Sequence, residues 1–442
     1  MRYQTVEELT VSPERGRVYE EGWQSWSPTT TYGVTETSRR PESMLRHRMR
    51  FRPGVEQPAS GFHAEGLLAV LPGDGGPVRV YGAPAVGEVP SIRAELDGET
   101  LRISADGPVV SFEAPDLASG LARFGDQYAA TAEVTPLKTP PSVWCSWYRY
   151  FEAVTEQDIL ENLAAVDELE LPVDVIQLDD GWEAGVGDWT PLGSKFPSLP
   201  KLTERIQESG RRAGIWLAPF MAGSGTELAA QHPDWLMGPA GENWGQDLLG
   251  LDLTHPDLRD YLWHTFRTLH EAGFDYFKLD FLYSGALPGT RYDDDVSAVE
   301  AYRSGLELIR DAVGAETYLV GCGAPILPSV GLLDGMRVSP DTFHEHAQDA
   351  NGELRGAMGT TARAWQHGRF WANDPDCLVA RPGFALREPW AAVVEQFGGL
   401  RSASDRISEL DDWGLETTRR VLANVPPAIP FPAFSQPLNG VS

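Results

Sequence analysis

Apolar segments in the middle of this sequence repeatedly end in side chains that can do chemistry. A single Asp after an apolar segment is most often a helix cap or a turn residue. Six or more segments that end this way are hard to explain by capping alone. The side chains are Trp147 and Tyr148, Asp179 and Asp180, Trp216, Lys278 and Asp280, Cys322, Arg337 and Asp341, and Asp374 and Asp376.

These residue types favour cleavage of a glycosidic bond. Two carboxylates that face each other are the machinery of glycoside hydrolysis. Tryptophans pack on the apolar faces of sugar rings, and Asp, Lys and Arg bind the hydroxyls. The sequence shows no plausible set of metal ligands and no serine nucleophile elbow. We therefore expect neither a metal nor a cofactor.

Lys278 is unusual among the basic residues of this region, which are almost all Arg. It lies two residues before Asp280 in FKLDF, so strand alternation places both side chains on one face. A compact ammonium group there can donate to hydroxyls and keep a nearby carboxylate ionised. The alternative is a purely structural ion pair.

The elements that must position these residues alternate between strands and helices from residue 139 onward. Helices are clearest over 156–169, 257–273 and 408–425, where apolar residues recur with helical spacing. Eight strands in this order favour the α/β class and a (β/α)8 TIM barrel, in which the chemistry lies at the carboxyl ends of the strands. No G-x-G-x-x-G follows a strand, which argues against a dinucleotide-binding fold. The strand segments are SVWCSWYRY, VDVIQLDDG, RAGIWLAPF, FDYFKLDFL, TYLVGCGAP, DGMRVSPDT, RFWANDPDCL and GGLRSASD.

The first part of the chain has a different pattern. Short apolar segments alternate with Gly, Pro and Asp turns, and few stretches carry a helical period. We expect an N-terminal antiparallel β-sandwich domain over 1–138, a catalytic barrel over 139–425 and a Pro-rich tail over 426–442. The Pro-rich stretch 135–142 is the expected linker.

Composition excludes several classes of partner. The chain has 442 residues, with 64 acidic and 36 basic residues and a net charge of −28. Nucleic acid and an anionic membrane surface are therefore not expected as partners. Three cysteines are too few for a disulfide framework, and neither a secretory signal nor a membrane-length apolar segment is evident. A cytoplasmic location is the expectation, and the oligomeric state stays open.

Eight motifs in order resemble the α-galactosidases of glycoside hydrolase family 36, in clan D, especially its shorter prokaryotic members. EGWQSWSP at 21–28 also resembles the family's N-terminal domain, which contributes a Trp to the active site. The resemblance runs from residue 21 to about 425. The eight motifs are WCSWYRYF, QLDDGW, GIWLAPF, LDLTHP, YFKLDFLYSGALPG, GCGAPILPSVG, DGMRVSPDT and FWANDPDCL.

This resemblance implies a retaining, exo-acting hydrolase of terminal α-D-galactose with a double-displacement mechanism. Asp280 matches the nucleophile and Asp341 the acid/base, which would remain protonated longer if it were the less solvated of the two. The family also carries a C-terminal antiparallel β-domain, and because the sequence ends before one, we expect it to be absent. The substrate-binding positions implied by the resemblance are Trp26, Trp147, Asp179, Asp180, Trp216, Lys278, Cys322 and Arg337.

Other functions stay open at this point. Related enzymes of altered specificity include an α-N-acetylgalactosaminidase, a β-L-arabinopyranosidase and a transgalactosylase of the raffinose-synthase type. A catalytically dead sugar-binding protein is the alternative of a different class. The Asp179–Asp180 pair favours a sugar with free 4- and 6-hydroxyls, which supports an α-galactoside as substrate.

Overall fold

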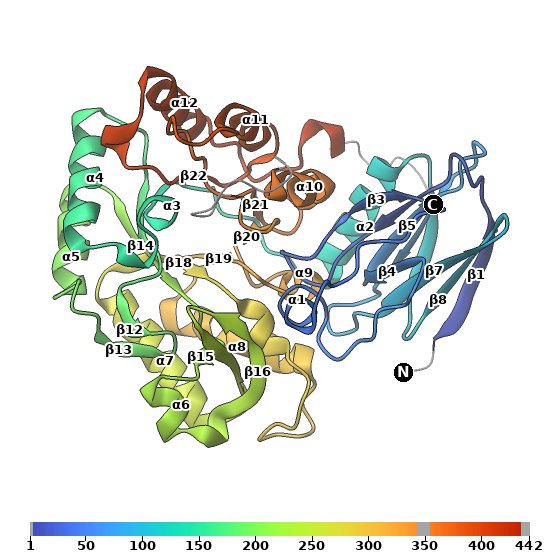
Figure 1. The fold of residues 1–442 in the computed structure, drawn as a ribbon, viewed down its shortest axis with the longest axis horizontal. Coiled ribbons are helices and arrows are strands. Elements are labelled where there is room, and N and C mark those ends of the chain that lie inside the picture. The colour runs from blue at the N-terminus through green and yellow to red at the C-terminus, as the bar shows by residue number, and fades with distance from the viewer. Residues whose placement is uncertain (1–2, 343–353, 435–442) are drawn as a thin grey trace.

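The protein has two parts of different architecture, a β-sandwich and a parallel barrel, which lie side by side (Figure 1). The computed structural model describes residues 3–342 and 354–434. Within those residues, no helix combines the length and the apolar character that a membrane span requires.

Eight parallel strands form the barrel, in the order β21-β20-β19-β18-β14-β11-β10-β22. The ring closes where Leu378, just beyond β21, forms a parallel bridge with Ala403 of β22. Each of the eight predicted strand segments contains one of these strands, so the predicted fold class is confirmed. The strands are β10 (Ser142–Cys145), β11 (Val175–Leu178), β14 (Arg212–Leu217), β18 (Phe274–Leu279), β19 (Tyr318–Gly321), β20 (Gly335–Arg337), β21 (Ala372–Asp374) and β22 (Arg401–Ala403).

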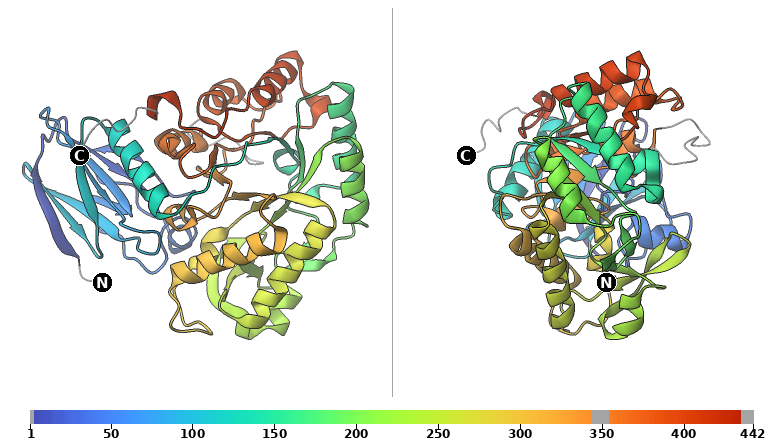
Figure 2. Two further views of the ribbon diagram at one scale, coloured as in Figure 1. Left: turned by 180° about the vertical axis from the view of Figure 1, so that it is seen from behind. Right: turned by 90° about the vertical axis from the view of Figure 1, so that its left-hand side faces the viewer.

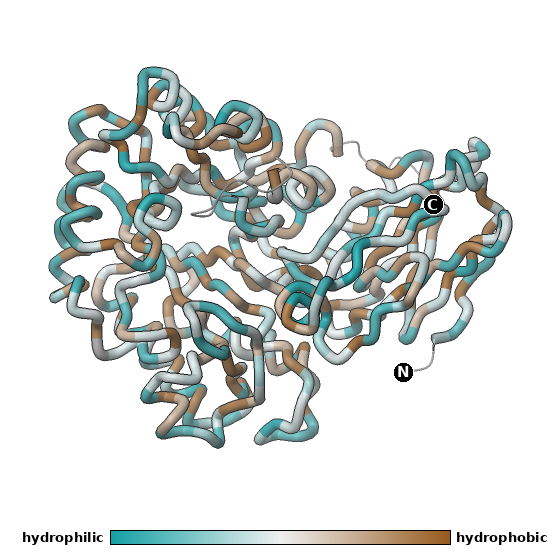
Figure 3. The backbone as a smooth tube through the Cα atoms, viewed as in Figure 1, coloured by the Kyte–Doolittle hydropathy of each residue, from teal (hydrophilic) through white to brown (hydrophobic). Residues whose placement is uncertain are grey.

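Amphipathic helices surround the barrel strands. The helix over Pro256–Glu271 buries Leu258, Leu262 and Phe266 on one face, as its spacing predicted. Along these outer helices, polar and apolar residues alternate (Figure 3). The helices of the barrel region are α3 (Trp147–Tyr150), α4 (Glu156–Glu168), α5 (Leu199–Glu208), α6 (Glu227–Gln231), α7 (Pro256–Glu271), α8 (Ala298–Val313), α9 (Ile326–Ser329), α10 (Arg355–Ala362), α11 (Arg387–Phe397) and α12 (Asp412–Ala423).

The N-terminal part is a sandwich of two antiparallel sheets, ordered β1-β8-β7-β4 and β3-β2-β5-β6-β9. Their facing sides bury a core that includes Val18, Phe62, Ile92 and Ile103. Figure 2 shows this sandwich at one end of the molecule. Its strands are β1 (Gln4–Thr10), β2 (Arg17–Glu20), β3 (Thr30–Gly33), β4 (Phe62–Glu65), β5 (Leu67–Leu71), β6 (Val78–Gly82), β7 (Ser91–Asp97), β8 (Thr100–Ala105) and β9 (Val110–Ala114).

Two helices in this part contradict the expectation that it carries little helix. The shorter is α1 (Met44–Arg50), and the longer is α2 (Leu117–Thr131), which begins at the Asp116 cap. Glycine has low helix propensity, and α2 contains two glycines that masked its pattern. Packing requires one of them, because a Cβ on Gly120 would lie 2.9 Å from Val80 Cγ2. The helix fills the space between the five-stranded sheet and the barrel, where Phe124 packs on Trp365 at 6.0 Å.

Small sheets extend the loops that follow β11 and β14. The first is the hairpin of β12 (Glu183–Gly185) and β13 (Asp188–Leu192). The second is the three-stranded sheet of β15 (Met221–Gly223), β17 (Gln246–Leu251) and β16 (Leu236–Asn243), and α1 packs against its β16. These insertions bring barrel residues to the N-terminal part at the open end of the ring.

A buried ion pair joins the two parts. Arg363 donates to Glu21 at 2.7 Å, and both side chains are fully buried. The same guanidinium donates to the carbonyls of Gln24 and Ser25, at 3.1 and 2.8 Å, and to that of Val338 in the barrel. Because all of these bonds except that to Val338 cross the joint, Arg363 fixes the loop around residues 24–26 on the barrel.

Loss of Arg363 should therefore destabilise the whole protein. Removing one partner of a buried ion pair leaves an uncompensated charge, and Arg363→Met should lower the free energy of unfolding by about 3–5 kcal/mol. Urea unfolding followed by circular dichroism measures this change. The matched control is Arg102→Met, which breaks the exposed pair with Glu8 and should leave the midpoint nearly unchanged. Equal effects of the two variants would show that the joint contributes no more than a surface pair.

Candidate active site

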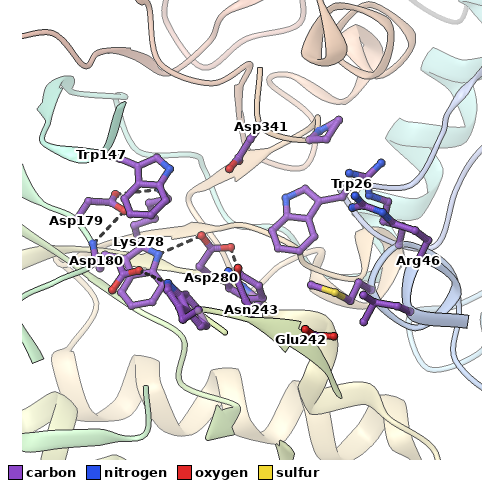
Figure 4. A pocket seen from close by; sticks show the side chains of 17 residues that line it. Trp26, Arg46, Trp147, Asp179, Asp180, Glu242, Asn243, Lys278, Asp280 and Asp341 are labelled. Atoms are coloured by element: carbon purple, nitrogen blue, oxygen red, sulfur yellow. Dashed lines mark hydrogen bonds and ion pairs between the residues drawn. The ribbon is translucent and has the colours of Figure 1, made fainter. Parts of the chain in front are cut away.

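A pocket of about 400 Å³ opens at the carboxyl ends of the barrel strands, within the size range of small-molecule sites. Side chains from both parts of the protein surround it (Figure 4). In the described ranges, no group of three or more His, Cys, Asp or Glu side chains could hold a metal ion. The lining consists of Trp26, Leu45, Arg46, Met49, Arg50, Trp147, Asp179, Asp180, Trp216, Glu242, Asn243, Trp244, Lys278, Asp280, Phe281, Pro340 and Asp341.

Asp280 lies at the base of the pocket, directly after β18. One carboxylate oxygen accepts from the indole of Trp216 at 3.1 Å, and the other accepts from the backbone N–H of Phe281 at 2.7 Å. Phe281, which donates this N–H, adopts a left-handed conformation with φ of 51°. Burial raises the pKa of Asp280, while Lys278 and the thiol of Cys322 lower it. These donors hold the carboxylate of Asp280 in place at the pocket. They also favour its charged form.

Lys278 pairs most closely with Asp179. Its ammonium lies 3.0 Å from Asp179 Oδ2, which also accepts from Gln177 and from the thiol of Cys145. The negative charges of Asp179 and Asp280 outweigh burial and raise the pKa of Lys278 well above its usual range. The ammonium group therefore interacts with both carboxylates. Lys278 lines the pocket and also forms an ion pair, so the two alternatives do not exclude each other.

Asp180 points into the pocket because the chain turns sharply after β11. Gly181 has φ of 115°, a conformation that glycine adopts without strain. Asp180 Oδ2 accepts from the indole N–H of Trp244 at 2.9 Å. Burial raises the pKa of Asp180 well above its usual value, and the nearby Glu183 adds to this effect. Asp179 and Asp180 are thus adjacent in sequence but differ in their bonding.

Asp341 lies at the mouth of the pocket, where its side chain is 46% exposed and 2.8 Å from Arg337. The condition under which Asp341 would remain protonated longer is therefore not met, because Asp280 is the less solvated of the two carboxylates, at 8% exposed. Arg337 also pairs with the buried Asp376 at 3.1 Å. Asp376 accepts from Tyr148 and from the N–H of Thr342, the residue after Asp341. Arg337 and Asp376 together hold the chain on which Asp341 stands.

Two of the residues expected to bind substrate do not line the pocket. Cys322 is fully buried behind Asp280, and Arg337 is 2% exposed behind Asp341. Strand alternation predicts the inward face of a residue but not its depth in the barrel. Both residues act on the pocket through the carboxylates in front of them.

The three expected tryptophans do line the pocket. Trp216 comes from β14, and Trp147 stands on α3, a short helix that begins where strand structure was expected to continue. Trp26 enters from the N-terminal part and packs edge-on against Phe281 at 5.0 Å. Its ring lies so close to Gly323 that a Cβ there would approach it to 3.0 Å. The Trp26 ring therefore requires a glycine at the end of β19.

Several pocket residues were not predicted from the sequence. Glu242 and Asn243 end β16, Trp244 lies in the turn between β16 and β17, and four residues come from α1. Trp244 has φ of 51° in the turn ENWGQ, and an aromatic residue followed by Gly was the available signal. For α1 the signal was MLRHRMRFR, which is strongly basic within an acidic chain.

Comparison with known proteins identifies relatives of this chain. Residues 138–309 match the protein family described as Melibiase. The α-galactosidase AgaA of Geobacillus stearothermophilus is 31% identical over 163 residues, which are 33% of this chain and 22% of that relative. α-Galactosidase 1 of Pediococcus pentosaceus is 33% identical over 144 residues, which are 28% of this chain and 20% of that relative. The matched segment thus spans about a fifth of the length of these curated relatives.

Among solved structures, the α-galactosidase TtGalA of Thermus thermophilus is similar over nearly the whole chain. Its complex with p-nitrophenyl α-D-galactopyranoside has a TM-score of 0.77 and 27% identity, and the match covers 96% of this chain and 92% of that one. The structure of AgaA from Geobacillus stearothermophilus has a TM-score of 0.63 at 17% identity, over 94% of this chain and 61% of that one. The second likeness concerns the fold alone.

The shared cation Arg337 leads to a prediction about stability and pH. Burial raises the pKa of Asp376 to about 6, although Arg337 opposes the rise. A folded-state pKa above that of the unfolded chain gives stability that is full at low pH and is lost as the pH rises through the folded pKa. Without Arg337 the pKa of Asp376 rises further, so more stability is lost as the pH rises. Arg337→Met should therefore lower the free energy of unfolding more at pH 8 than at pH 5. At pH 8 the decrease should be about 3–5 kcal/mol.

Urea unfolding at the two pH values measures this difference. In the double variant Arg337→Met/Asp376→Asn, the buried charge is absent, and most of the additional penalty at pH 8 should disappear. If Arg337→Met is equally destabilising at both pH values, with or without Asp376, the carboxylate does not depend on this cation.

Proposed function

We propose that the chain is a retaining α-galactosidase of glycoside hydrolase family 36, because residues 138–309 match the Melibiase family and the fold is similar to that of α-galactosidases. Its substrates are oligosaccharides or glycosides that end in α-D-galactose. One observation carries the proposal: the buried Asp280, the half-exposed Asp341 and the pair Asp179–Asp180 face one pocket. Further support comes from TtGalA, which has been solved with p-nitrophenyl α-D-galactopyranoside and with stachyose.

In the first chemical step, Asp280 attacks the anomeric carbon of the galactosyl group. The hydrogen bonds from Trp216 and Phe281 hold its carboxylate in place, and Lys278 favours its charged form. Asp341, in its protonated form, gives its proton to the oxygen of the leaving group. The carbon–oxygen bond breaks, and a covalent galactosyl ester of Asp280 remains.

In the second step, water enters from the mouth of the pocket. Asp341 removes a proton from this water, which attacks the anomeric carbon and releases Asp280. Its 46% exposure suits this role, because the incoming water and the departing group both pass it. Two successive inversions at carbon give retention of the α configuration.

Selectivity for galactose rests on buried carboxyl groups at the closed end of the pocket. Asp179 and Asp180 are buried there, and Lys278 lies between Asp179 and the pocket. Carboxylates make strong hydrogen bonds to hydroxyls, and a buried carboxylate left without a donor is costly. We assign the pair to the axial 4-hydroxyl and the 6-hydroxyl, so that a glucoside leaves one acceptor unsatisfied.

The assignment of the nucleophile is tested by Asp280→Asn. An amide cannot form the ester, so kcat should fall by about 4 orders of magnitude or more for p-nitrophenyl α-galactoside. Sodium azide should restore activity and give the β-galactosyl azide, which proton NMR identifies. Rescue also demonstrates that the variant is folded. Substantial activity without azide would assign the nucleophile to another residue.

The role of the acidic pair is tested by Asp180→Ala. This variant should lower kcat/KM for α-galactosides and reduce the preference for α-galactosides over α-glucosides, by about tenfold or more. Trp244→Phe is the control, because it removes the indole N–H that donates to Asp180, together with part of the ring, and leaves the carboxylate present. The alternative is a structural role, in which the melting temperature of Asp180→Ala falls and the galactoside-to-glucoside ratio stays the same.

A further inference from the structure

One face of α1 forms part of the pocket wall. Leu45, Arg46, Met49 and Arg50 line the pocket, and positions one and four residues apart lie together on one side of a helix. The intervening Arg48 does not line it. Two guanidinium groups and two apolar side chains of α1 thus border the same space.

The position of α1 is fixed by hydrogen bonds to its backbone and by packing against β16. No residue of α1 is buried. Gln24 and Ser27 donate to the carbonyls of Met49 and Arg50, from the loop that carries Trp26. A third contact joins the ring of His47 to the carbonyl of Val55 at 3.1 Å. These contacts hold α1 in place while Leu45, Arg46, Met49 and Arg50 border the pocket.

The charge of this segment is opposite to that of the chain. Residues 43–55 contain four Arg and no Asp or Glu, whereas the chain has a net charge of −28. Arg52 pairs with Glu65, but no described carboxylate forms an ion pair with the guanidinium of Arg46. A guanidinium at the wall of a pocket is suited to bind an anionic group of a ligand.

These cations lie on the leaving-group side of the pocket. Figure 4 shows Arg46 beside Trp26, across Asp280 and Asp341 from Asp179 and Asp180. In the proposed function, galactose occupies the end with the Asp pair, and Asp341 protonates the leaving oxygen. The group that departs then lies against Trp26 and α1.

We propose that the leaving group of the natural substrate carries an anion, a carboxylate or a phosphate, that Arg46 binds. This inference rests on the proposed function and adds the class of the aglycone. A guanidinium fits either anion through two parallel hydrogen bonds, while Leu45 and Met49 contact the apolar part of the aglycone. The charge of the whole chain opposes this only weakly, since salt screens charges beyond about 8–10 Å.

Three aryl α-galactosides test the inference: the 4-carboxyphenyl, 4-phosphonophenyl and neutral 4-carbamoylphenyl compounds. The measured quantity is kcat/KM for each anionic substrate divided by that for the neutral one. Comparing this ratio between variants cancels the intrinsic reactivity of each phenol. Arg46→Gln should lower the ratio by about tenfold, the size expected for a hydrogen bond to a charged group. Raising NaCl should lower the wild-type ratio as well.

Arg48→Gln is the matched control, since it removes the same charge from the same helix outside the pocket, and its ratio should equal that of the wild type. If Arg46→Gln lowers the ratio for only one of the two anionic substrates, the inference is supported and the anion is identified. Equal ratios in the wild type and Arg46→Gln overturn it, while turnover of the neutral galactoside leaves the proposed function intact. Failure to turn over any of the three substrates contradicts the proposed function itself.

Discussion

Five carboxylates line one small pocket, and their mutual repulsion is the constraint that the surrounding polar groups must offset. Two buried cations compensate them: Lys278 beside Asp179 and Asp280, and Arg337 between Asp341 and Asp376. Neutral donors make up the rest, namely the indoles of Trp216 and Trp244 and the N–H of Phe281. A buried charge is tolerated only with such partners, so the residues behind the pocket are constrained as strongly as those that line it.

The N-terminal part completes this pocket. Arg363 fixes the loop that carries Trp26, and the same loop holds α1 through Gln24 and Ser27. One buried ion pair therefore determines where an aromatic wall and a cationic wall stand relative to Asp280. The barrel supplies the acidic end of the pocket, and the sandwich supplies much of the opposite side.

The ring of strands was predictable because each strand is an apolar segment that ends in turn or polar residues, as in VIQLDDG. Helix α2 was not, since its two glycines lower helix propensity and are explained only by close packing in the folded protein. The pocket residues on the strands were predictable from alternation, but their depth was not, and Cys322 and Arg337 lie behind the lining. The exposure of Asp341 depends on a loop, and the positions of α1 and Trp244 depend on contacts between distant segments, which sequence spacing does not encode.

The ion pair between Glu21 and Arg363 spans 342 positions of the chain, and this has a consequence for synthesis. The ribosome produces the sandwich first, and domains generally begin to fold as they emerge. Glu21 must then remain without its cation, and Trp26 without the glycine it packs on at 323, until nearly all of the barrel has been made. The nascent chain thus folds the strands of its sandwich early and completes its binding pocket last. A complete pocket is therefore present only in a fully assembled molecule.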